Sequence, residues 1–402
     1  MPDLRRRSIF AAASIGGVAA ASRVLGAQPA GAADASHSNP GPRDPVLAGL
    51  NPSAFNPPAT DHGDLPAFKY PFSVEHTRLE EGGWARQVTV KDFPIAESLA
   101  GVNMRLTAGG IRELHWHKAA EWSYMLTGKA RITAMDEKGR HFAADVGEGD
   151  LWYFPSGIPH SIQGLGPDGC EFLLVFDDGA FSEFNTFLVT DWFAHTPKDV
   201  LAKNFGAPES AFADIPPKEL YIFQGQMPPP LAEALAESHQ PPVPTAFNFG
   251  MTAQAPIQAK GGTVRIADSR NFQAASTIAA ALVEVEPGGM REMHWHPNAD
   301  EWQYYIAGRA RMTVFGAGGR ARTADFDMGD VGYIPRMMGH YIENSGSETL
   351  RFLEIFRSDR YEDVSLEQWL ANTPKELVQQ HLHLADGLID RLSQDKRFVV
   401  SG

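Results

Sequence analysis

The stretch RELHWHKAAEW (residues 112–122) carries two histidines one residue apart, followed four residues later by a glutamate. A nearly identical stretch, REMHWHPNADEW (residues 291–302), lies 179 residues further along the chain. Alternate side chains of a β-strand point to the same face, so we expect His115 and His117 to point together and Trp116 to point away. Each copy therefore predicts a pair of imidazoles aimed in one direction.

The similarity extends well beyond these two stretches. GGWARQVTVKDF, which begins at Gly82, aligns with GGTVRIADSRNF, which begins at Gly261. GDLWYFPSGIPH, which ends at His160, aligns with GDVGYIPRMMGH, which ends at His340, at an offset of 180 residues. Because internal repeats of this length mark duplicated units, we expect two homologous halves.

Both halves are rich in short segments of β-branched and aromatic residues separated by Gly, Pro and Asp. Their spacing, about 8–12 residues, is typical of an all-β sandwich or barrel. The fold class that we expect is all-β, with two tandem antiparallel jelly-roll barrels and a few short helices. The expected parts are a first domain over 67–226, a proline-rich linker over 227–244 and a second domain over 245–402, with helical patterns at 198–205, 230–238 and 366–382.

Composition excludes some classes of function. The 402-residue chain has a net charge of −14, which argues against a nucleic-acid partner because such partners favour a basic face. Its single cysteine, Cys170, excludes an internal disulfide and is expected to be an inert core residue.

The first 34 residues resemble a twin-arginine export signal. Three arginines, residues 5–7, precede a weakly apolar run over 9–21 that is rich in Ala and Gly. We expect an exported protein, periplasmic or secreted. The alternative is a membrane anchor, but the run is shorter than the roughly 20 residues that span a bilayer, so we expect no membrane association in the mature form. Residues 35–66 are expected to form a linker or N-terminal arm.

The duplicated motif predicts two metal sites. Three imidazoles and one carboxylate with open positions suit Mn, Fe, Ni or Co better than a structural zinc site. A single His-x-His pair would fit a buried core histidine equally well, and only the repetition of the whole set favours metal binding. The predicted ligands are His115, His117, Glu121 and His160 in the first half, and His294, His296, Glu301 and His340 in the second. Whether both sites are catalytic stays open.

These patterns resemble the cupin superfamily. The first half carries Gly109-x5-His115-x-His117-x3-Glu121-x6-Gly128 and Gly149-x5-Pro155-x-Gly157-x2-His160, and the second half repeats both motifs. Two positions depart from the pattern. Gly164 replaces an expected Asn, and Met337 replaces an expected Gly, but neither is a ligand position.

From about residue 50 to the C-terminus the chain is similar to the bicupin oxalate decarboxylases. RELHWH, GEGDLWYFPSGIPHSIQ and REMHWHPNADEWQYYIAG carry the resemblance. It implies manganese in both sites, dioxygen as a required co-substrate, oxalate as substrate, formate and CO2 as products, and a homo-oligomer. The alternatives on the same scaffold are an oxalate oxidase that releases H2O2 and a binding or storage bicupin, although the latter usually lacks complete ligand sets.

An arginine precedes each pair of histidines by three residues. Arg112 and Arg291 can hold a substrate carboxylate and stabilise developing negative charge. Because an odd spacing puts Arg112 on the wrong face of a regular strand, we expect a bend or bulge, for which the pair Gly109-Gly110 is one candidate. The alternative is a surface arginine in a salt bridge.

The two halves differ in their candidate proton-transfer groups. Leu174 aligns with Glu354, so only the second half is expected to have a glutamate fixed on the barrel wall. The first half continues instead into DDGAFSEFNTF (177–187), which resembles the lid of the family. The resemblance assigns acid/base catalysis to Glu183 and favours the first site as the catalytic one. The usual lid, Ser-Glu-Asn-Ser-Thr, reads Ser-Glu-Phe-Asn-Thr here, and this change leaves the partition between decarboxylase and oxidase open.

Overall fold

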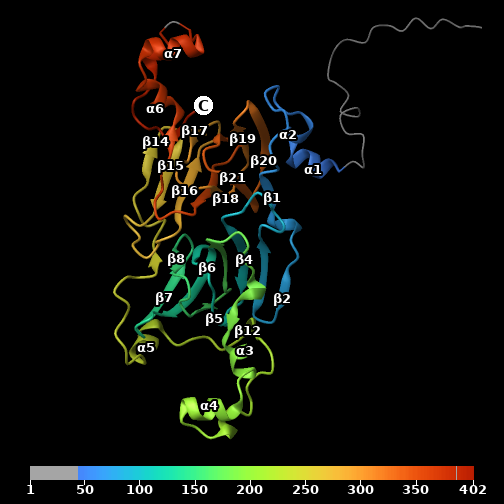
Figure 1. The fold of residues 1–402 in the computed structure, drawn as a ribbon, viewed down its shortest axis with the longest axis vertical. Helices are drawn as coiled ribbons and strands as arrows, with labels where there is room; N and C mark the ends of the chain where they lie inside the picture. The colour runs from blue at the N-terminus through green and yellow to red at the C-terminus, as the bar shows by residue number, and fades with distance from the viewer. Residues whose placement is uncertain (1–43, 386) are drawn as a thin grey trace, which may run out of the picture. The chain divides into compact units, whose positions relative to one another are not determined.

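The computed structural model describes residues 44–385 and 387–402 (Figure 1). The predicted export signal, residues 1–34, lies outside the described residues, as does the first part of the predicted arm. Among the helices that the structure describes, none is long and apolar enough to cross a bilayer.

The first half has two antiparallel layers of strands. The long strand β6 takes part in both layers and so joins them into a barrel. The first part of β6 pairs with β8 and β10, and its second part pairs with β7 and β9. The strands are β2 (Arg78–Glu80), β3 (Gly83–Val88), β4 (Ala100–Leu106), β5 (Gly110–Trp116), β6 (Glu121–Met135), β7 (His141–Gly147), β8 (Leu151–Phe154), β9 (His160–Gly164), β10 (Cys170–Phe176), β11 (Phe187–Leu188) and β12 (Ile222–Gln224).

The second half repeats this architecture with two sheets, ordered β1-β21-β18-β23-β16-β15-β14 and β20-β19-β22-β17-β24, with β25 beside β17 and β1 (Lys69–Pro71) contributed from the first half. The strands are β14 (Ile257–Ala259), β15 (Gly262–Ala267), β16 (Ala279–Val285), β17 (Met290–Trp295), β18 (Glu301–Ala307), β19 (Ala310–Gly316), β20 (Arg320–Phe326), β21 (Asp330–Ile334), β22 (Gly339–Asn344), β23 (Leu350–Phe356), β24 (Val364–Ser365) and β25 (Val399–Val400). The expected fold class, two tandem all-β barrels, is confirmed.

The register of the sheets agrees with the sequence alignment of the halves. Leu174 pairs with Val102 between β10 and β4, and Glu354 pairs with Ala281 between β23 and β16. Leu174 and Glu354 therefore occupy equivalent places in the two barrels.

The two barrels are joined by more than the linker. β1 (Lys69–Pro71) pairs with β21 of the second barrel, and β13 (Asn248–Phe249) pairs with β8 of the first. A core of buried side chains continues from Trp122 in the first barrel to Trp302 in the second. A Cβ on Gly101 would lie only 2.5 Å from the Trp302 ring, so this contact requires glycine.

The described part of the predicted arm packs on the second barrel through α1 (Pro45–Leu50) and α2 (Pro52–Phe55). The backbone N–H of Ser53 donates to Oδ2 of Asp325 at 2.6 Å, and the N–H of Thr323 donates to Oδ2 of Asp61 at 2.7 Å. The predicted linker 227–244 contains α5 (Leu231–Ala236).

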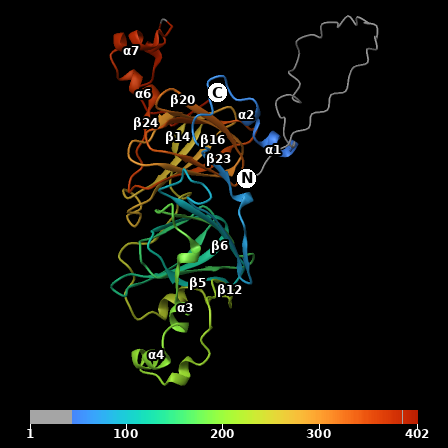
Figure 2. The same cartoon turned by 45° about the vertical axis from the view of Figure 1, so that its right-hand side comes forward.

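A pair of short helices extends from each barrel (Figures 1 and 2). These are α3 (Val189–Ala194) and α4 (Lys198–Phe205) in the first half, and α6 (Leu366–Ala371) and α7 (Lys375–Leu382) in the second. The helical pattern over 366–382 is thus interrupted, because Pro374 cannot continue the helix before it. Trp192 of α3 contacts Trp116 with ring centroids 5.5 Å apart, and Trp369 of α6 contacts Trp295 at 5.7 Å.

Candidate metal centres and active site

The four predicted ligands of the first half come together at one end of the barrel. His115 and His117 lie at the end of β5, Glu121 begins β6, and His160 begins β9. Their ligand atoms all lie within 4.8 Å of one another, and all four residues are buried. The Nε2 atoms of His117 and His160 are 3.3 Å and 3.4 Å from Oε2 of Glu121.

The second set forms an equivalent cluster, also within 4.8 Å and buried. The Nε2 atoms of His296 and His340 are 3.1 Å and 2.8 Å from Oε2 of Glu301, and His294 completes the set. The additional residue before Glu301 therefore leaves the cluster intact. The predictions that these eight residues gather in two groups of four are confirmed.

The histidine rings are held so that their free nitrogens converge. Each of the six Nδ1 atoms lies 2.6–3.1 Å from a backbone carbonyl oxygen, which can only accept, so Nδ1 donates and Nε2 keeps its lone pair. Several converging atoms are buried without a hydrogen-bond partner in the described structure: Nε2 of His160, His294, His296 and His340, and Oε2 of Glu301. Buried lone pairs of this kind fit a divalent transition metal, because they otherwise remain unsatisfied.

The other oxygen of each carboxylate is held by the barrel. Oε1 of Glu121 accepts hydrogen bonds from Ser123 Oγ at 3.1 Å and Trp152 Nε1 at 3.0 Å. Oε1 of Glu301 accepts one from Gln303 Nε2 at 2.6 Å. Oε2 is thereby directed at the histidines, as in a metal ligand supported by its neighbours.

The electrostatics of the clusters favour deprotonated ligands. Burial, followed by the nearby Arg112, lowers the pKa of His115 well below its usual value, and burial lowers the pKa of His160 as well. Burial and Arg291 act in the same way on His294. Burial would raise the pKa of Glu121, but its histidine neighbours bring it below the usual range. At neutral pH a metal would therefore displace few protons.

A β-bulge turns each arginine inward. The pairing of β5 with β9 is irregular between Arg112 and His115, and that of β17 with β22 is irregular between Arg291 and His294. Both arginines are almost fully buried, at 1% and 0% exposure. The expected bulge is confirmed, but it lies after the arginine, so the proposed position at Gly109-Gly110 was wrong.

In the first centre Arg112 contacts the predicted lid glutamate. Its Nη2 donates to Oε2 of Glu183 at 2.9 Å, and its guanidinium carbon lies 4.5 Å from the centre of the Tyr221 ring. Glu183 begins a short 3-10 helix, η2 (Glu183–Asn185), and its backbone N–H donates to Gln87 Oε1 at 3.0 Å. The structure thus brings both predicted catalytic residues together beside the first ligand cluster.

In the second centre Arg291 is surrounded by fixed acceptors. Its Nε donates to Oε1 of Glu354 at 3.1 Å, and its Nη2 lies 2.6 Å from both Asp363 Oδ2 and the Tyr361 hydroxyl. Its Nη1 also donates to the carbonyl of Phe398 at 3.2 Å. Glu354 is fully buried on β23, and this burial raises its pKa. The predicted position of Glu354 on the barrel wall is confirmed.

Sequence reasoning gave no role to two buried glutamates, Glu113 and Glu292, that follow the arginines. Glu113 accepts hydrogen bonds from the backbone N–H groups of Leu220 and Tyr221 at 2.9 Å and 2.8 Å. Glu292 accepts one from Phe398 N–H at 3.1 Å. Each glutamate therefore anchors a distant segment over its site. The repeated Arg-Glu pair in both motif copies was the signal that could have revealed them.

The anchored residues, Tyr221 and Phe398, were also missed. Each has a positive φ of 56° and precedes a strand, β12 or β25, that pairs with the strand of the histidines. Burial, together with the neighbouring Glu183, raises the pKa of Tyr221 well above its usual value, so Tyr221 stays protonated. More than 100 residues separate Tyr221 from Arg112 in sequence, and no local pattern marks the contact.

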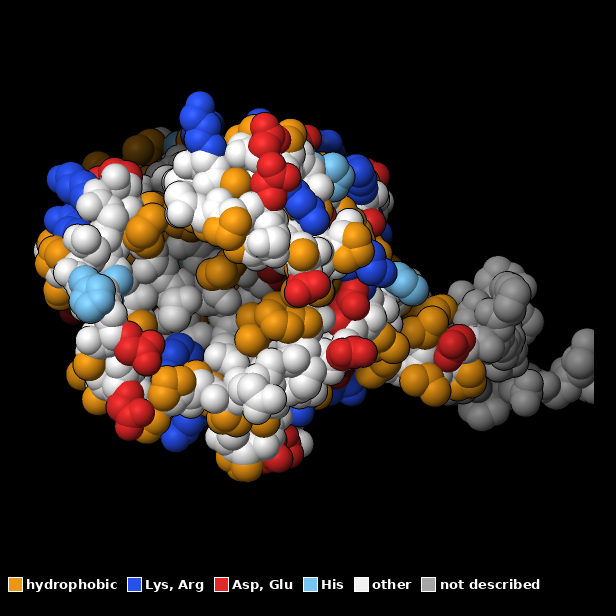
Figure 3. Space-filling view, turned by 90° about the horizontal axis from the view of Figure 1, so that it is seen from below, with side chains coloured by type: hydrophobic (Ala, Val, Ile, Leu, Met, Phe, Trp, Pro, Cys, Tyr) orange, Lys and Arg blue, Asp and Glu red, His pale blue; other side chains and the backbone are white. Residues whose placement is uncertain are grey.

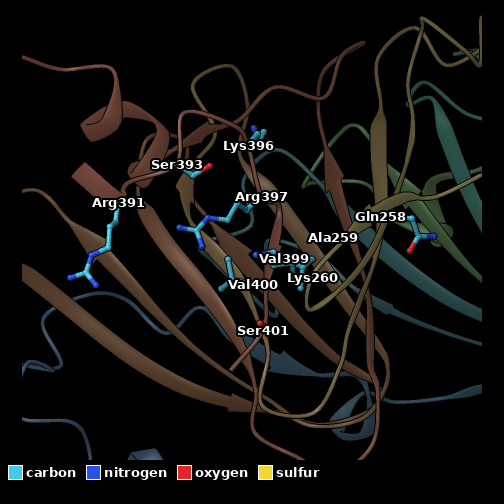
Figure 4. A pocket seen from close by; sticks show the side chains of 10 residues that line it. All are labelled: Gln258, Ala259, Lys260, Arg391, Ser393, Lys396, Arg397, Val399, Val400 and Ser401. Atoms are coloured by element: carbon cyan, nitrogen blue, oxygen red, sulfur yellow. The ribbon is translucent and has the colours of Figure 1, made fainter. Parts of the chain in front are cut away.

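Cavities adjoin both centres. One of about 170 Å³ is lined by Arg78, Glu183, Phe184 and Tyr221 among others, and one of about 460 Å³ borders His294 and His340. A third, of about 510 Å³, lies between the C-terminal segment and the edge of β14 and includes no predicted ligand (Figure 4). Among the described side chains on the face in Figure 3, acidic and basic groups are interspersed.

Two antiparallel barrels, each with three histidines and one glutamate clustered at one end, define a bicupin with two metal-binding sites. The cupin family model matches residues 72–211 and 248–388, and the chain belongs to this family, more narrowly to its bicupin oxalate decarboxylases, which are carboxy-lyases.

Two curated relatives carry the similarity in sequence. The chain is 59% identical over 350 residues to oxalate decarboxylase OxdC of Bacillus subtilis strain 168, covering 87% of this chain and 91% of the relative. It is 43% identical to a probable oxalate decarboxylase of Arthroderma benhamiae, covering 87% of each. A solved structure of the Bacillus enzyme, described with Mn(II) centres, matches with a TM-score of 0.88 at 57% identity, covering 90% of this chain and 96% of that one.

Proposed function

We propose that the protein is a manganese- and dioxygen-dependent oxalate decarboxylase that converts oxalate to formate and CO2 at its first centre. The observation that carries this proposal is the buried pair of Arg112 and Glu183 beside the first ligand cluster. Similarity to decarboxylases with Mn(II) centres supports the choice of reaction and metal.

The present partners of Arg112 and Arg291 indicate which of the two arginines is free to bind a substrate carboxylate. Arg112 has one carboxylate partner, Glu183, and that partner lies on a loop. A carboxylate of oxalate is a chemical replacement for Glu183, and a guanidinium binds such a group in a bidentate manner. Arg291 is instead bonded to two carboxylates, Glu354 on β23 and Asp363 in the segment before β24, so substrate binding there would need to displace both. This contrast favours the first centre.

Glu183 supplies the proton transfers. When bound, manganese with dioxygen would provide the electron sink that oxalate itself lacks. Displaced from Arg112, the Glu183 carboxylate can accept the proton of the hydrogen oxalate anion, and the C–C bond then breaks with loss of CO2. Glu183 returns this proton to the remaining carbon, which becomes the C–H of formate. One hydrogen oxalate thus gives one formate and one CO2, with no net change in protons or electrons.

The alternative is an oxalate oxidase, in which dioxygen captures the one-carbon fragment before the proton does. We expect purified, Mn-loaded protein to form formate close to one per oxalate consumed, with peroxide as a minor product. Metal content, formate and peroxide would be measured on the same preparation. Peroxide as the dominant product would overturn the decarboxylase proposal.

We also propose export through the twin-arginine pathway, which rests on the sequence of residues 1–34 alone. Substituting Arg5, Arg6 and Arg7 by lysine should retain the protein in the cytoplasmic fraction. Equal export of this variant would contradict the proposal.

A homo-oligomer is the assembly that we propose. Its support is the large apolar side chains exposed on the helices of both halves, with Trp192 at 63% and Trp369 at 55% exposure. Light scattering coupled to size exclusion would give the mass, and a monomer at micromolar concentration would contradict this expectation.

A further inference from the structure

Arg78 contacts two aromatic side chains at the first centre, one of which belongs to the lid. Its guanidinium carbon is 3.7 Å from the centre of the Tyr221 ring and 5.8 Å from that of Phe184. Tyr221 is also 4.5 Å from Arg112, which binds Glu183, and Glu183 adjoins Phe184 in the chain. Arg78 and the rings of Phe184 and Tyr221 therefore connect the lid to Arg112, the proposed substrate-binding arginine.

The guanidinium of Arg78 is fixed in place by two carboxylates. Its Nε donates to Glu80 Oε1 at 2.6 Å, and its Nη2 donates to Glu219 Oε1 at 3.0 Å. These bonds lie in the guanidinium plane and leave its faces to the aromatic rings, a geometry that lysine cannot reproduce. The side chain is 24% exposed, so its interaction with the rings is partly shielded from water.

The lid is held at its base, where Phe181 is buried against Phe176, and is exposed at its tip. Phe184, at its tip, is 68% exposed, and its backbone N–H has one long bond, 3.3 Å, to Ser182 Oγ. Glu183 is held through Gln87 and Arg112. Among the described residues, the Arg78 guanidinium lies within cation–π range of this exposed ring and can restrain it.

The second half lacks this arrangement. Strands β2 and β14 are equivalent, because Arg78 pairs with Ala85 and Ile257 pairs with Val264 in the same register. Ile257, 40% exposed, therefore occupies the place of Arg78. The corresponding loop of the second centre is contacted by a different arginine, Arg270, through the Tyr361 carbonyl and Glu362.

We propose that Arg78 is a positioning residue that holds the lid closed through Phe184 and thereby sets the ratio of formate to peroxide. A lid held near the reacting carbon lets Glu183 return its proton before dioxygen reacts, whereas a loose lid favours oxidation. This inference rests on the proposed function, and it assigns to Arg78 and Phe184 the control of product outcome at that site.

The test compares five single variants, one of them a control, with the parent protein at equal manganese content. Arg78→Met and Phe184→Leu remove one side of the contact, and the peroxide-to-formate ratio should rise about two- to five-fold in each. Arg78→Lys should resemble Arg78→Met, because the planar fork is lost, and Phe184→Tyr should keep the parent ratio. Arg86→Met is the matched control, since Arg86 lines the same cavity but contacts Trp84 and Phe72 instead of the lid.

A double variant and an activity-independent readout complete the experiment. Arg78→Met with Phe184→Leu should change the ratio no more than the larger single change, because both remove one interaction. Hydrogen exchange of the amides of residues 183–185 should be faster in both single variants and unchanged in Arg86→Met. The parent protein could also fail to make formate while the lid amides still exchange faster in the variants. That result would support the restraint by Arg78 and refute the proposed decarboxylase activity. Unchanged lid exchange, or an unchanged product ratio in an active parent, would overturn the role of Arg78.

Discussion

Arg112 donates a hydrogen bond to Glu183 across 2.9 Å, and both side chains are almost completely buried. Breaking such a pair is unfavourable when it leaves a buried charge without a partner. In the proposed reaction a substrate carboxylate would avoid this, because it would replace the Glu183 carboxylate on the guanidinium. Binding of the anion would then release Glu183 to act as the general base.

Glu183→Gln removes the proton carrier and keeps the size of the side chain. We expect formate production to fall by about 10²–10⁴-fold, the usual contribution of acid/base catalysis, with manganese content unchanged. The control is Glu354→Gln, which changes the buried glutamate beside Arg291 in the second barrel and should retain formate production. The reverse result would move catalysis to the second centre.

Arg112→Lys and Arg291→Lys separate substrate binding from structure. Arg112→Lys should lower kcat/KM for oxalate by about tenfold or more, because a bidentate clamp is lost. Arg291→Lys should mainly lower stability, by about 3–5 kcal/mol, since Glu354 and Asp363 would lose a buried partner. Steady-state kinetics measures the loss of substrate binding, and thermal unfolding measures the loss of stability. Similar kinetic losses in both variants would contradict the assignment of substrate binding to Arg112.

His115→Ala and His294→Ala test the two metal centres. Each should reduce bound manganese from two ions per chain to one, measured by elemental analysis after dialysis. Both should also lower the Tm, since a metal that binds only the folded state stabilises it. Formate production should be lost in His115→Ala and retained in His294→Ala. Loss of both ions from either variant would show that the centres do not form independently.

Met337 adopts a positive φ of 73° at the turn where the first half has Gly157, with φ of 77°. A left-handed conformation costs a non-glycine residue about 1–2 kcal/mol. Because Met337 is 62% exposed and loses little burial, Met337→Gly should raise the free energy of unfolding by about 0.5–1 kcal/mol. Gly157→Ala, with open space around the new Cβ, should lower it by about 1 kcal/mol. Calorimetry of both variants would show whether the two changes in the free energy of unfolding have opposite signs.

Burial raises the pKa of the Cys170 thiol to about 12, and the side chain is inaccessible. The thiolate is the reactive form, so a disulfide reagent at pH 8 should label native protein negligibly and guanidinium-unfolded protein fully. The folded state binds this proton more tightly than the unfolded state, so the contribution of Cys170 to stability falls as pH rises from about 8.5 toward 12. Rapid labelling of native protein would contradict the burial.

The sequence was sufficient for the features that depend on local spacing. The His-x-His pair, the parity of Trp116 and the need for a bulge near Arg112 all follow from the period of a strand, although the position of the bulge did not. The duplication then located the second centre and the equivalence of Leu174 and Glu354.

Features that depend on distant segments were out of reach. Arg291 meets Asp363 across 72 residues, and Arg112 meets the Tyr221 carbonyl across 109. Strand periodicity predicts the face to which a side chain points, but not the strand with which its own strand pairs. It therefore could not predict that β1 pairs with a strand of the second barrel and β13 with a strand of the first. The arm around Ser53 looked like linker for the same reason, since its order comes from contacts with Asp325.

The reciprocal placement of β1 and β13 bears on the history of the chain. A duplicated gene first yields two copies that could each survive alone. Once each barrel had come to include a strand supplied from the other side, deletion of either copy would remove a piece of its neighbour. Neither half is therefore complete on its own, because each barrel depends on the other half of the chain for one strand of its sheet.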